Sequence, residues 1–341
     1  MKLRGAVLAS LASLSGISAV HAADAVVYAE PEPMEYVRIC DVYGAGFFYI
    51  PGTETCLQIG GYMRYRMDYV KQEGMPYVFT KTARFAPSFD VRSETEWGTL
   101  RGFAHLFFEW NSLDGNDVYA DQLFMELQMG SGTLLVGKTD NPYARFFGDY
   151  GAPGEFEGDF AGQIYNSGEV SYTYEAANGF SAVIAAIETG TGQFEPNIET
   201  GAIYRKDWGS IGGMVGYDNP DDSWGAKAVG RVNFDPFALG VHVLYSSSES
   251  GTYGAVNPGS GETSEWSILA HAEVKLNEKI AVNGYLQWFD ATTSGDSAWQ
   301  AKGGLALTPI ENLEVLPEVR YTKVSGGADS WEGVLRVTRS F

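Results

Sequence analysis

Apolar and polar side chains alternate along most of the chain beyond residue 56. Between Leu57 and Val70 the odd positions are mostly apolar or aromatic, and most even positions carry polar or charged side chains. A period of two residues is typical of a β-strand with one apolar and one polar face. The segments Ala83–Arg92 and Thr99–Trp110 follow the same pattern and predict two further strands. Thirteen more strands are predicted to begin near Tyr119, Thr133, Gly168, Phe180, Thr200, Ile211, Ser223, Leu239, Glu265, Ile280, Ala298, Leu313 and Trp331.

The links between these sixteen predicted strands alternate in length. Links after the odd-numbered strands are long and polar, whereas links after the even-numbered strands are short, as at Gly130–Gly132 and Asp207–Ser210. Long loops at one end and tight turns at the other are typical of bacterial outer-membrane barrels. We therefore expect an all-β fold, a 16-stranded antiparallel transmembrane β-barrel over residues 56–341, with both termini on the periplasmic, short-turn side. The predicted long links are Lys71–Thr80, Asn111–Asn116, Thr139–Tyr165, Thr189–Glu199, Asp218–Asp222, Ser247–Ser264, Ala291–Ser297 and Val324–Ser330.

Aromatic side chains collect on the apolar face at the long-loop end of the predicted strands. A girdle of this kind is typical of a membrane–water interface. Alternation alone would also suit a soluble barrel, but a soluble core gives no reason for aromatic residues to gather at one end. The girdle therefore favours a membrane location. Its members are Tyr69, Trp110, Tyr217, Trp224, Tyr245, Trp266, Trp288, Trp299, Tyr321 and Trp331.

The N-terminal residues predict export. Lys2 and Arg4 precede a weakly apolar run, and a small-residue cleavage site ends at Ala22, so residues 1–22 are predicted to be a secretory signal peptide. No later segment approaches the roughly 18 consecutive apolar residues that a membrane helix requires, so a membrane span would have to consist of strands. Residues 23–55 contain prolines and glycines without a sustained period, and we expect them to form an N-terminal periplasmic entry segment.

Charge and composition narrow the function classes. The 341-residue chain carries 43 acidic and 23 basic side chains, a formal net charge of −20. This balance argues against nucleic acid as a partner, because phosphate backbones are bound by basic surfaces. Glycine, tyrosine and phenylalanine are plentiful, at 42, 20 and 19 residues, which favours strands and turns over helices.

Cys40 and Cys56 are the only cysteines in the chain. An exported protein meets an oxidising compartment, so we predict that the two form a disulfide. In the chain-entropy model a loop of this length would be stabilised by roughly 3 kcal/mol. The alternative is a pair of unpaired, buried thiols.

Residues 139–166 form the longest predicted irregular segment, called here the long loop. A loop of this length is usually functional or disordered. Its many aromatic residues, such as Tyr143 and Phe160, argue against disorder because they offer surface for packing. We predict that the long loop folds inward against the wall of a pore.

Charged residues predict two opposing walls inside that pore. Five arginines from three consecutive strands share the polar face, and the long loop supplies four carboxylates opposite them. Such a pair of walls creates a transverse field that orients dipolar solutes and separates the paths of ions. The acidic balance predicts a weak preference for cations. The predicted constriction consists of Arg64, Arg66, Arg84, Arg92 and Arg101 on the wall, and of Asp149, Glu155, Glu157 and Asp159 on the long loop.

A structural role for the arginines is the alternative. They could pair with lumen carboxylates and only hold the barrel together, since structural ion pairs are common in such networks. For Arg92, which has carboxylates on both sides in sequence, the two interpretations stay open. The candidate partners are Asp68, Asp90, Glu94 and Glu109.

No pattern nominates an enzyme. His105, His242 and His271 follow the predicted signal peptide without a cysteine or histidine at metal-ligand spacing. No serine–histidine–carboxylate motif is recognisable either. We therefore predict no catalytic residues, no metal and no cofactor. The alternative to a channel is an outer-membrane adhesin or surface scaffold that uses the segment Ser247–Ser264, which we expect to be long and exposed.

The segment from Tyr36 to Tyr65, with its core YGAGFFYIPGTETC, resembles the start of mature alphaproteobacterial porins. The pieces LLVGKTDNP before the long loop and DWGS at Asp207–Ser210 are similar to elements of the same family. The final strand, WEGVLRVTRSF, resembles the C-terminal recognition strand of outer-membrane proteins, with Arg339 at a position that is more often apolar.

The resemblance implies a function and a setting. Porins of this family are sixteen-stranded homotrimeric barrels of the bacterial outer membrane, surrounded by lipid and lipopolysaccharide. They pass small hydrophilic solutes and ions by passive diffusion, and their third long loop folds inward as a constriction. By order and length, the long loop of this chain corresponds to that third loop.

Overall fold

The computed structural model describes residues 38–148, 151–160 and 166–341. The predicted signal peptide, the first part of the predicted entry segment and Asp149 lie outside these residues. Among the described residues, no helix is long and apolar enough to cross a membrane.

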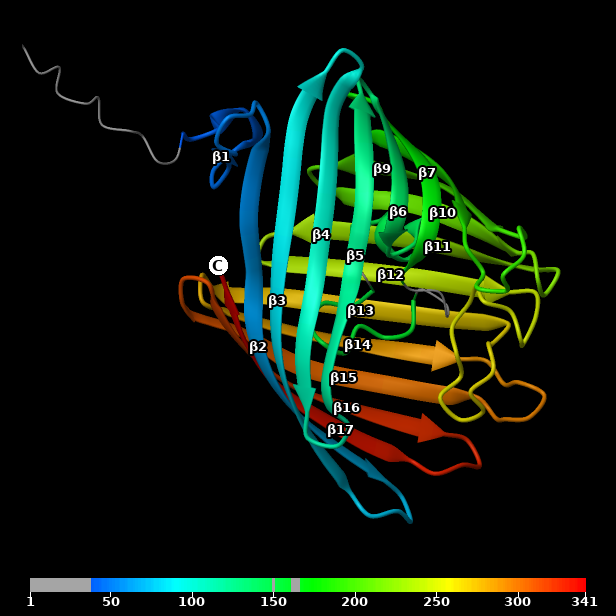
Figure 1. Ribbon diagram of the computed structural model, residues 1–341. Coiled ribbons are helices and arrows are strands. Elements are labelled where there is room, and N and C mark those ends of the chain that lie inside the picture. Colours follow the sequence, from blue (N-terminus) through cyan, green and yellow to red (C-terminus); the bar gives the residue numbers. More distant parts are fainter. Residues whose placement is uncertain (1–37, 149–150, 161–165) are drawn as a thin grey trace, which may run out of the picture. The chain divides into compact units, whose positions relative to one another are not determined.

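Sixteen strands form one closed antiparallel barrel, as predicted. Each strand pairs with its neighbours in sequence, and the last strand pairs with the first of the sixteen. Closure leaves no unpaired sheet edge, as hydrocarbon surroundings demand. Figure 1 shows β2–β5 in the foreground, with β12–β17 behind them and running across their direction. The strands are β2 (Cys56–Gln72), β3 (Val78–Thr95), β4 (Gly98–Asn111), β5 (Gly115–Met129), β6 (Gly132–Thr139), β7 (Ser167–Glu175), β8 (Phe180–Ile187), β9 (Asn197–Lys206), β10 (Gly209–Asp218), β11 (Ser223–Phe234), β12 (Phe237–Ser246), β13 (Trp266–Asn277), β14 (Ile280–Phe289), β15 (Ala298–Ile310), β16 (Leu313–Val324) and β17 (Ser330–Ser340).

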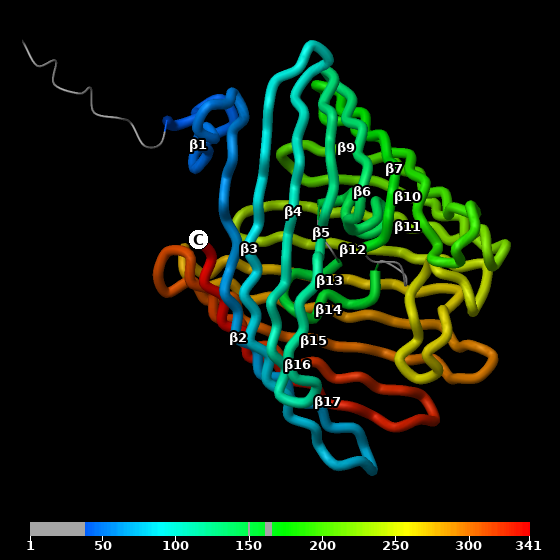
Figure 2. Tube along the Cα trace, in the orientation of Figure 1, coloured from blue at the N-terminus to red at the C-terminus, as the bar shows by residue number. Residues whose placement is uncertain are grey.

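The two faces of each strand differ as the alternating pattern predicts. On β10, Ile211, Val215 and Tyr217 are exposed on the outside, whereas Met214 between them is buried. An outward apolar face suits lipid, and the inward face is left to polar groups and packed loops. The trace in Figure 2 shows the long connections 247–265 and 290–297 at one end, and the turns 278–279 and 311–312 at the other.

Strands β2–β5 are longer than the sequence predicts. They contain 14 to 18 residues, so that the expected long links 71–80 and 111–116 shrink to residues 73–77 and 112–114. Polar residues such as Lys71 and Asn111 belong to the predicted links but lie within strands. A strand can continue beyond the apolar band, because water satisfies polar side chains on both faces there.

A short N-terminal segment, residues 38–55, precedes the barrel and is fixed to it. It contains a 3-10 turn, η1 (Asp41–Tyr43), and a two-residue strand, β1 (Phe48–Tyr49), which pairs with β2. The predicted disulfide between Cys40 and Cys56 is confirmed, and both cysteines are buried against Phe47.

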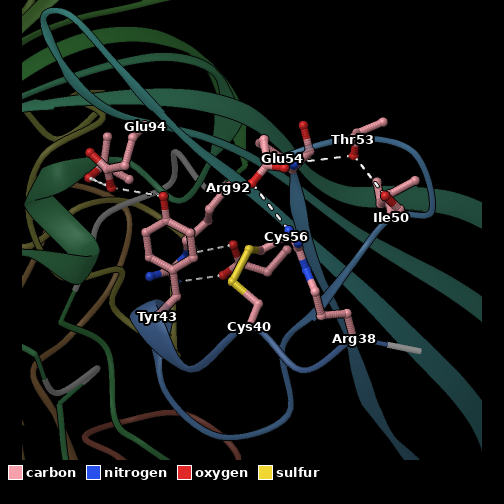
Figure 3. The surroundings of a disulfide bond; sticks show 12 residues. Arg38, Cys40, Tyr43, Ile50, Thr53, Glu54, Cys56, Arg92 and Glu94 are labelled. Carbon is pink, nitrogen blue, oxygen red and sulfur yellow. Dashed lines mark hydrogen bonds and ion pairs between the residues drawn. A yellow bond between two sulfur atoms is a disulfide. The ribbon is translucent and has the colours of Figure 1, made fainter. Parts of the chain in front are cut away.

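Contacts with β3 hold the same segment against the inward face of the wall. The Tyr43 hydroxyl donates to Glu94 over 2.8 Å, next to the disulfide in Figure 3. The Arg92 guanidinium lies 5.0 Å from the centre of the Phe47 ring. The segment therefore covers part of the wall at the short-turn end.

Candidate functional site

The long loop joins β6 to β7 and begins with a four-residue helix, α1 (Pro142–Arg145). The part of the loop before residue 149, called here its first limb, is held by two buried side chains of the barrel wall. The Glu199 carboxylate on β9 accepts a hydrogen bond from the backbone N–H of Tyr143 over 2.8 Å. Lys227 on β11 donates to the carbonyl oxygen of Tyr143 and, over 3.1 Å, to that of Phe160. Lys227 thus ties both limbs of the long loop to one point on the wall.

Lys227 is almost fully buried, with 2 % of its surface exposed. Its ammonium nitrogen lies 4.8 Å from the ring centre of Tyr143, 5.2 Å from that of Phe147 and 5.6 Å from that of Phe160. A buried ammonium group requires such compensation, because burial strips it of water. Three rings and two carbonyl oxygens supply it.

Residues 151–160, called here the second limb, are held by side chains of β14, β15 and β16. Gln287 accepts from the backbone N–H of Asp159 over 2.8 Å and donates to its carbonyl oxygen over 2.7 Å. Glu318 accepts from the backbone N–H groups of Glu155 and Phe156, each over 2.9 Å. Lys302 pairs with Glu318 over 3.0 Å and donates to the Pro153 carbonyl. These contacts fix the backbone that carries Glu155, Glu157 and Asp159.

Glu155 lies at the junction where the barrel closes. Arg66 on β2 and Arg336 on β17 are direct cross-strand partners, and like charges in such positions repel each other. The Glu155 carboxylate pairs with Arg66 over 2.6 Å and also with Arg336. One loop carboxylate therefore bridges two guanidinium groups of the wall, and Arg336 also pairs with Glu314 over 2.6 Å.

The five predicted wall arginines have different surroundings. Arg66 also pairs with Asp68 over 2.8 Å, and Arg84 pairs with Glu109 over 2.5 Å. Arg92 and Arg101 share Asp90, over 2.8 Å and 2.9 Å, as the structural alternative expected for Arg92. Among the described residues Arg64 has no ion pair, and its guanidinium lies 4.6 Å from the Tyr62 ring centre.

The wall arginines also lie at two levels. Eight residues separate Arg84 from Arg92, or roughly 26 Å along an extended strand. Arg64 is the register partner of Arg84, and Arg92 is the partner of Arg101 near the short turns. Arg64, Arg66 and Arg84 thus form one group with Glu155, and the other two arginines lie closer to the N-terminal segment.

The loop carboxyl groups differ in their charge. Burial, together with the neighbouring Glu155, raises the pKa of Glu157 to about 8. Burial raises the pKa of Asp159 to about 7. Burial alone would also raise the pKa of Glu155, but Arg336 and Arg66 hold it below its ordinary value. Near neutral pH the long loop therefore carries less negative charge than its sequence implies.

Several residues of this site escaped the sequence prediction. Arg336 could have been found, because it lies on the polar face of the last strand and barrel closure brings that strand next to β2. Lys227, Gln287 and Glu318 gave no comparable signal, because polar residues are ordinary on the inward face of a barrel strand.

The connection 247–265, called here the second loop, corrects another expectation. The adhesin alternative assumed that Ser247–Ser264 is exposed, but Tyr253, Ala255 and Asn257 are buried, with 1 % or less of their surface accessible. By contrast, Phe194 in the connection between β8 and β9 is 97 % exposed. The second loop packs onto the molecule and offers little surface for adhesion.

The three histidines of the described residues lie on barrel strands, and the Asp121 carboxylate beside His105 also accepts a hydrogen bond from Asn166 of the long loop over 2.7 Å. His105 contacts Asp121 over 3.0 Å through Nδ1, and the rings of His242 and His271 are 5.5 Å apart. Over residues 38–148, 151–160 and 166–341, no three histidine, cysteine or acidic side chains are grouped as a metal would require.

Comparison with known proteins agrees with the fold. Residues 24–335 match the family model described as "Porin subfamily". The chain is 34 % identical over 385 residues to Porin Omp2b of Brucella canis, and 34 % identical over 380 residues to Porin Omp2b of Brucella suis biovar 1, with 100 % of each chain covered.

Solved structures with the same fold include two outer-membrane proteins. The channel DcaP of Acinetobacter baumannii superposes with a TM-score of 0.67 at 12 % identity, covering 86 % of this chain and 99 % of that one. A triple mutant of the Rhodopseudomonas blastica porin gives a TM-score of 0.62 at 14 % identity, covering 84 % and 100 %.

Proposed function

The chain belongs to the porin subfamily and is an outer-membrane channel protein, not an enzyme; from this premise we propose that the long loop forms its constriction. Small hydrophilic solutes and ions diffuse passively through the barrel and past this loop. The observation that carries the proposal is the position of Glu155, which reaches across to Arg66 and Arg336 on the inward face of the wall.

Charge at this level shapes the selectivity. Arg64 faces the lumen beside Arg66 without an ion pair among the described residues, and Glu155 is neutralised by two guanidinium groups. Low-dielectric walls focus the field of the remaining charges at a narrow point. Because Glu157 is mostly protonated and Asp159 is about half ionised near pH 7, the weak cation preference depends on the acidic mouth and on the protonation of these two carboxyl groups. The proposed constriction consists of Arg64, Arg66, Arg84, Arg92, Arg101, Glu155, Glu157 and Asp159, with Asp149 outside the described residues.

The assembly and the N-terminus follow the same family pattern. We propose a homotrimer embedded in outer-membrane lipid and lipopolysaccharide, supported by the family relationship and by the apolar outer face. Residues 1–22 would be removed on export, and residues 23–55 would form a periplasmic entry segment. Crosslinking of the purified protein in detergent should give a limiting species of three chains.

Planar-bilayer recording tests the constriction. Glu155→Gln removes the carboxylate shared by Arg66 and Arg336, so we expect the reversal potential in a salt gradient to shift toward anions. Glu195→Gln is the matched control, because it makes the same chemical change on an exposed loop. The reversal potential is best measured at low salt, since screening shortens the reach of exposed charges. If both variants match the wild type, the long loop does not line the ion path.

A further inference from the structure

The second loop reaches the barrel interior through one aromatic side chain. Tyr253 is 1 % exposed and belongs to a buried cluster with Tyr143, Phe147 and Met214. Met214 lies on the inward face of β10, whereas its neighbour Val215 is exposed on the outside. Tyr253 therefore packs on the lumen side of the wall.

Two glycines make room for this side chain. Gly216 on β10 and Gly225 on β11 are direct cross-strand partners. A Cβ atom on Gly216 would lie 2.5 Å from the Tyr253 ring, and one on Gly225 would lie 2.3 Å from the Tyr253 carbonyl oxygen. Any larger residue at either position would collide with Tyr253. The pair forms a notch in the wall that the Tyr253 ring occupies.

From this notch Tyr253 contacts the first limb of the long loop. Its ring centre lies 5.0 Å from that of Tyr143. Its hydroxyl donates to the Glu199 carboxylate over 2.9 Å, and the same carboxylate accepts the backbone N–H of Tyr143. Glu199 thus connects the second loop, the wall and the long loop.

A second contact reaches the other limb. The backbone N–H of Val256 donates to the Asp159 carboxylate over 3.0 Å. The second loop is itself anchored at its base, where Thr252 N–H donates to Asp218 over 3.0 Å and Asn257 donates to the Asp290 carbonyl over 2.8 Å. An anchored loop that contacts both limbs can restrain the long loop in addition to Gln287 and Glu318.

We propose that the second loop is a part of the pore, and that Tyr253 is a positioning residue that holds the long loop in its conducting position. This inference rests on the proposed constriction and extends it to a second element. Without Tyr253 the long loop would keep its contacts to Glu199, Lys227 and β14–β17 but lose the packing of Tyr143 in α1 against the Tyr253 ring. The open channel would then fluctuate as the loop leaves and regains its place.

Single-channel recording of three variants tests the proposal. Tyr253→Phe removes the hydroxyl but keeps the ring, and should raise the frequency of brief closures several-fold. Tyr253→Ala empties the notch and should raise it further. Tyr217→Phe is the matched control, because that tyrosine lies on the outer face of the same wall and donates to Asp222 outside the pore. Its closure frequency should equal that of the wild type.

A double-mutant cycle separates positioning from general destabilisation. Gly216→Ala should displace the Tyr253 ring and raise closures as Tyr253→Ala does, but it should add nothing in the Tyr253→Ala background. Folding is checked by the heat-modifiable gel mobility of each barrel. The inference would be overturned if the folded variants closed as often as the wild type, or if the effects of the two changes on closure frequency were additive. Neither outcome would contradict the proposed channel function. Absence of any channel in the wild type would instead overturn the proposed function.

Discussion

Glu157 lies in the long loop between two differently charged neighbours, Glu155 and Asp159. Burial and Glu155 raise its pKa from 4.5 to about 8, against the opposing effect of Arg336 and Lys302. Because the raised pKa means that the docked loop favours the protonated form, the stabilising effect is complete below about pH 4.5 and is lost as the pH rises through about 8. The same titration changes the charge of the pore.

We expect the cation preference to increase as the pH rises from about 6 to 10, since Glu157 gains a negative charge in that range. The reversal potential in a potassium chloride gradient measures this change. Glu157→Gln should make this dependence shallower around pH 8 and leave the part near pH 7 that comes from Asp159. An equally steep dependence in the variant would assign the titration to another group.

Lys227 is the residue at which both limbs of the long loop meet the wall. Lys227→Met keeps the approximate volume and the apolar packing but removes the ammonium group, with its donors to Tyr143 and Phe160 and its contacts with the three rings. Hydrogen bonds to charged groups contribute about 1.5–3 kcal/mol each, so we expect the loop to become more susceptible to protease while the barrel stays folded. Lys206→Met is the control, because Lys206 lies outside this network, over the Tyr204 ring. Equal cleavage rates in the two variants would show that Lys227 does not hold the long loop on the wall.

The strands could be predicted from the sequence, whereas the positions at which the loops pack on the barrel wall could not. A period of two residues is a local pattern, so it reveals each strand without knowledge of its partners. The ion pair of Glu155 with Arg336 joins residues 181 positions apart, and no local pattern encodes such a partner. The aromatic residues of the long loop did indicate that it packs, but not where.

The composition of the second loop explains why it was expected to be exposed. It is rich in serine and glycine, which is typical of exposed loops. Its buried part consists mainly of small residues, such as Ala255 and Thr263, with Tyr253 as its one buried ring. The buried backbone and hydroxyl groups form hydrogen bonds, as from the Thr263 hydroxyl to the Gly251 carbonyl. A loop buried in this way shows no hydrophobic pattern in the sequence.

The disulfide fixes the N-terminal segment rather than the barrel. Replacing Cys40 and Cys56 with serine removes a cross-link worth roughly 3 kcal/mol in the chain-entropy model. We expect residues 38–55 to become sensitive to chymotrypsin at Tyr43 and Phe47, while the heat-modifiable mobility of the barrel stays unchanged. Reduced wild-type protein should give the same fragments. Loss of the folded barrel in the serine variant would show that the cross-link supports the whole fold.

Phe341 joins the end of the last strand to β2 and β3, near the place where the barrel closes. The backbone N–H of Phe341 donates to the Gly61 carbonyl over 3.0 Å, and its ring stacks on Phe85 at 6.0 Å. Deletion of Phe341 removes both contacts where the last strand meets the first, so we expect a lower yield of folded barrel in refolding experiments. Phe194→Ala, which removes an exposed ring elsewhere, should refold with the wild-type yield. Equal yields for all three proteins would show that closure does not need this residue.

The placement of Glu155 has a consequence for engineering the channel. Arg66 and Arg336 are neighbours where the last strand pairs with the first, called here the seam. The Glu155 carboxylate, which reduces their repulsion, comes from the loop inside the barrel. Shortening that loop to admit larger solutes also removes the carboxylate that bridges the two arginines, and among the described residues leaves each with a single partner on the wall, Asp68 for Arg66 and Glu314 for Arg336. In a wider version of this channel, a compensating change such as Arg336→Gln would remove the repulsion that the lost bridge leaves between the two arginines. Permeability and closure are not independent variables in this protein.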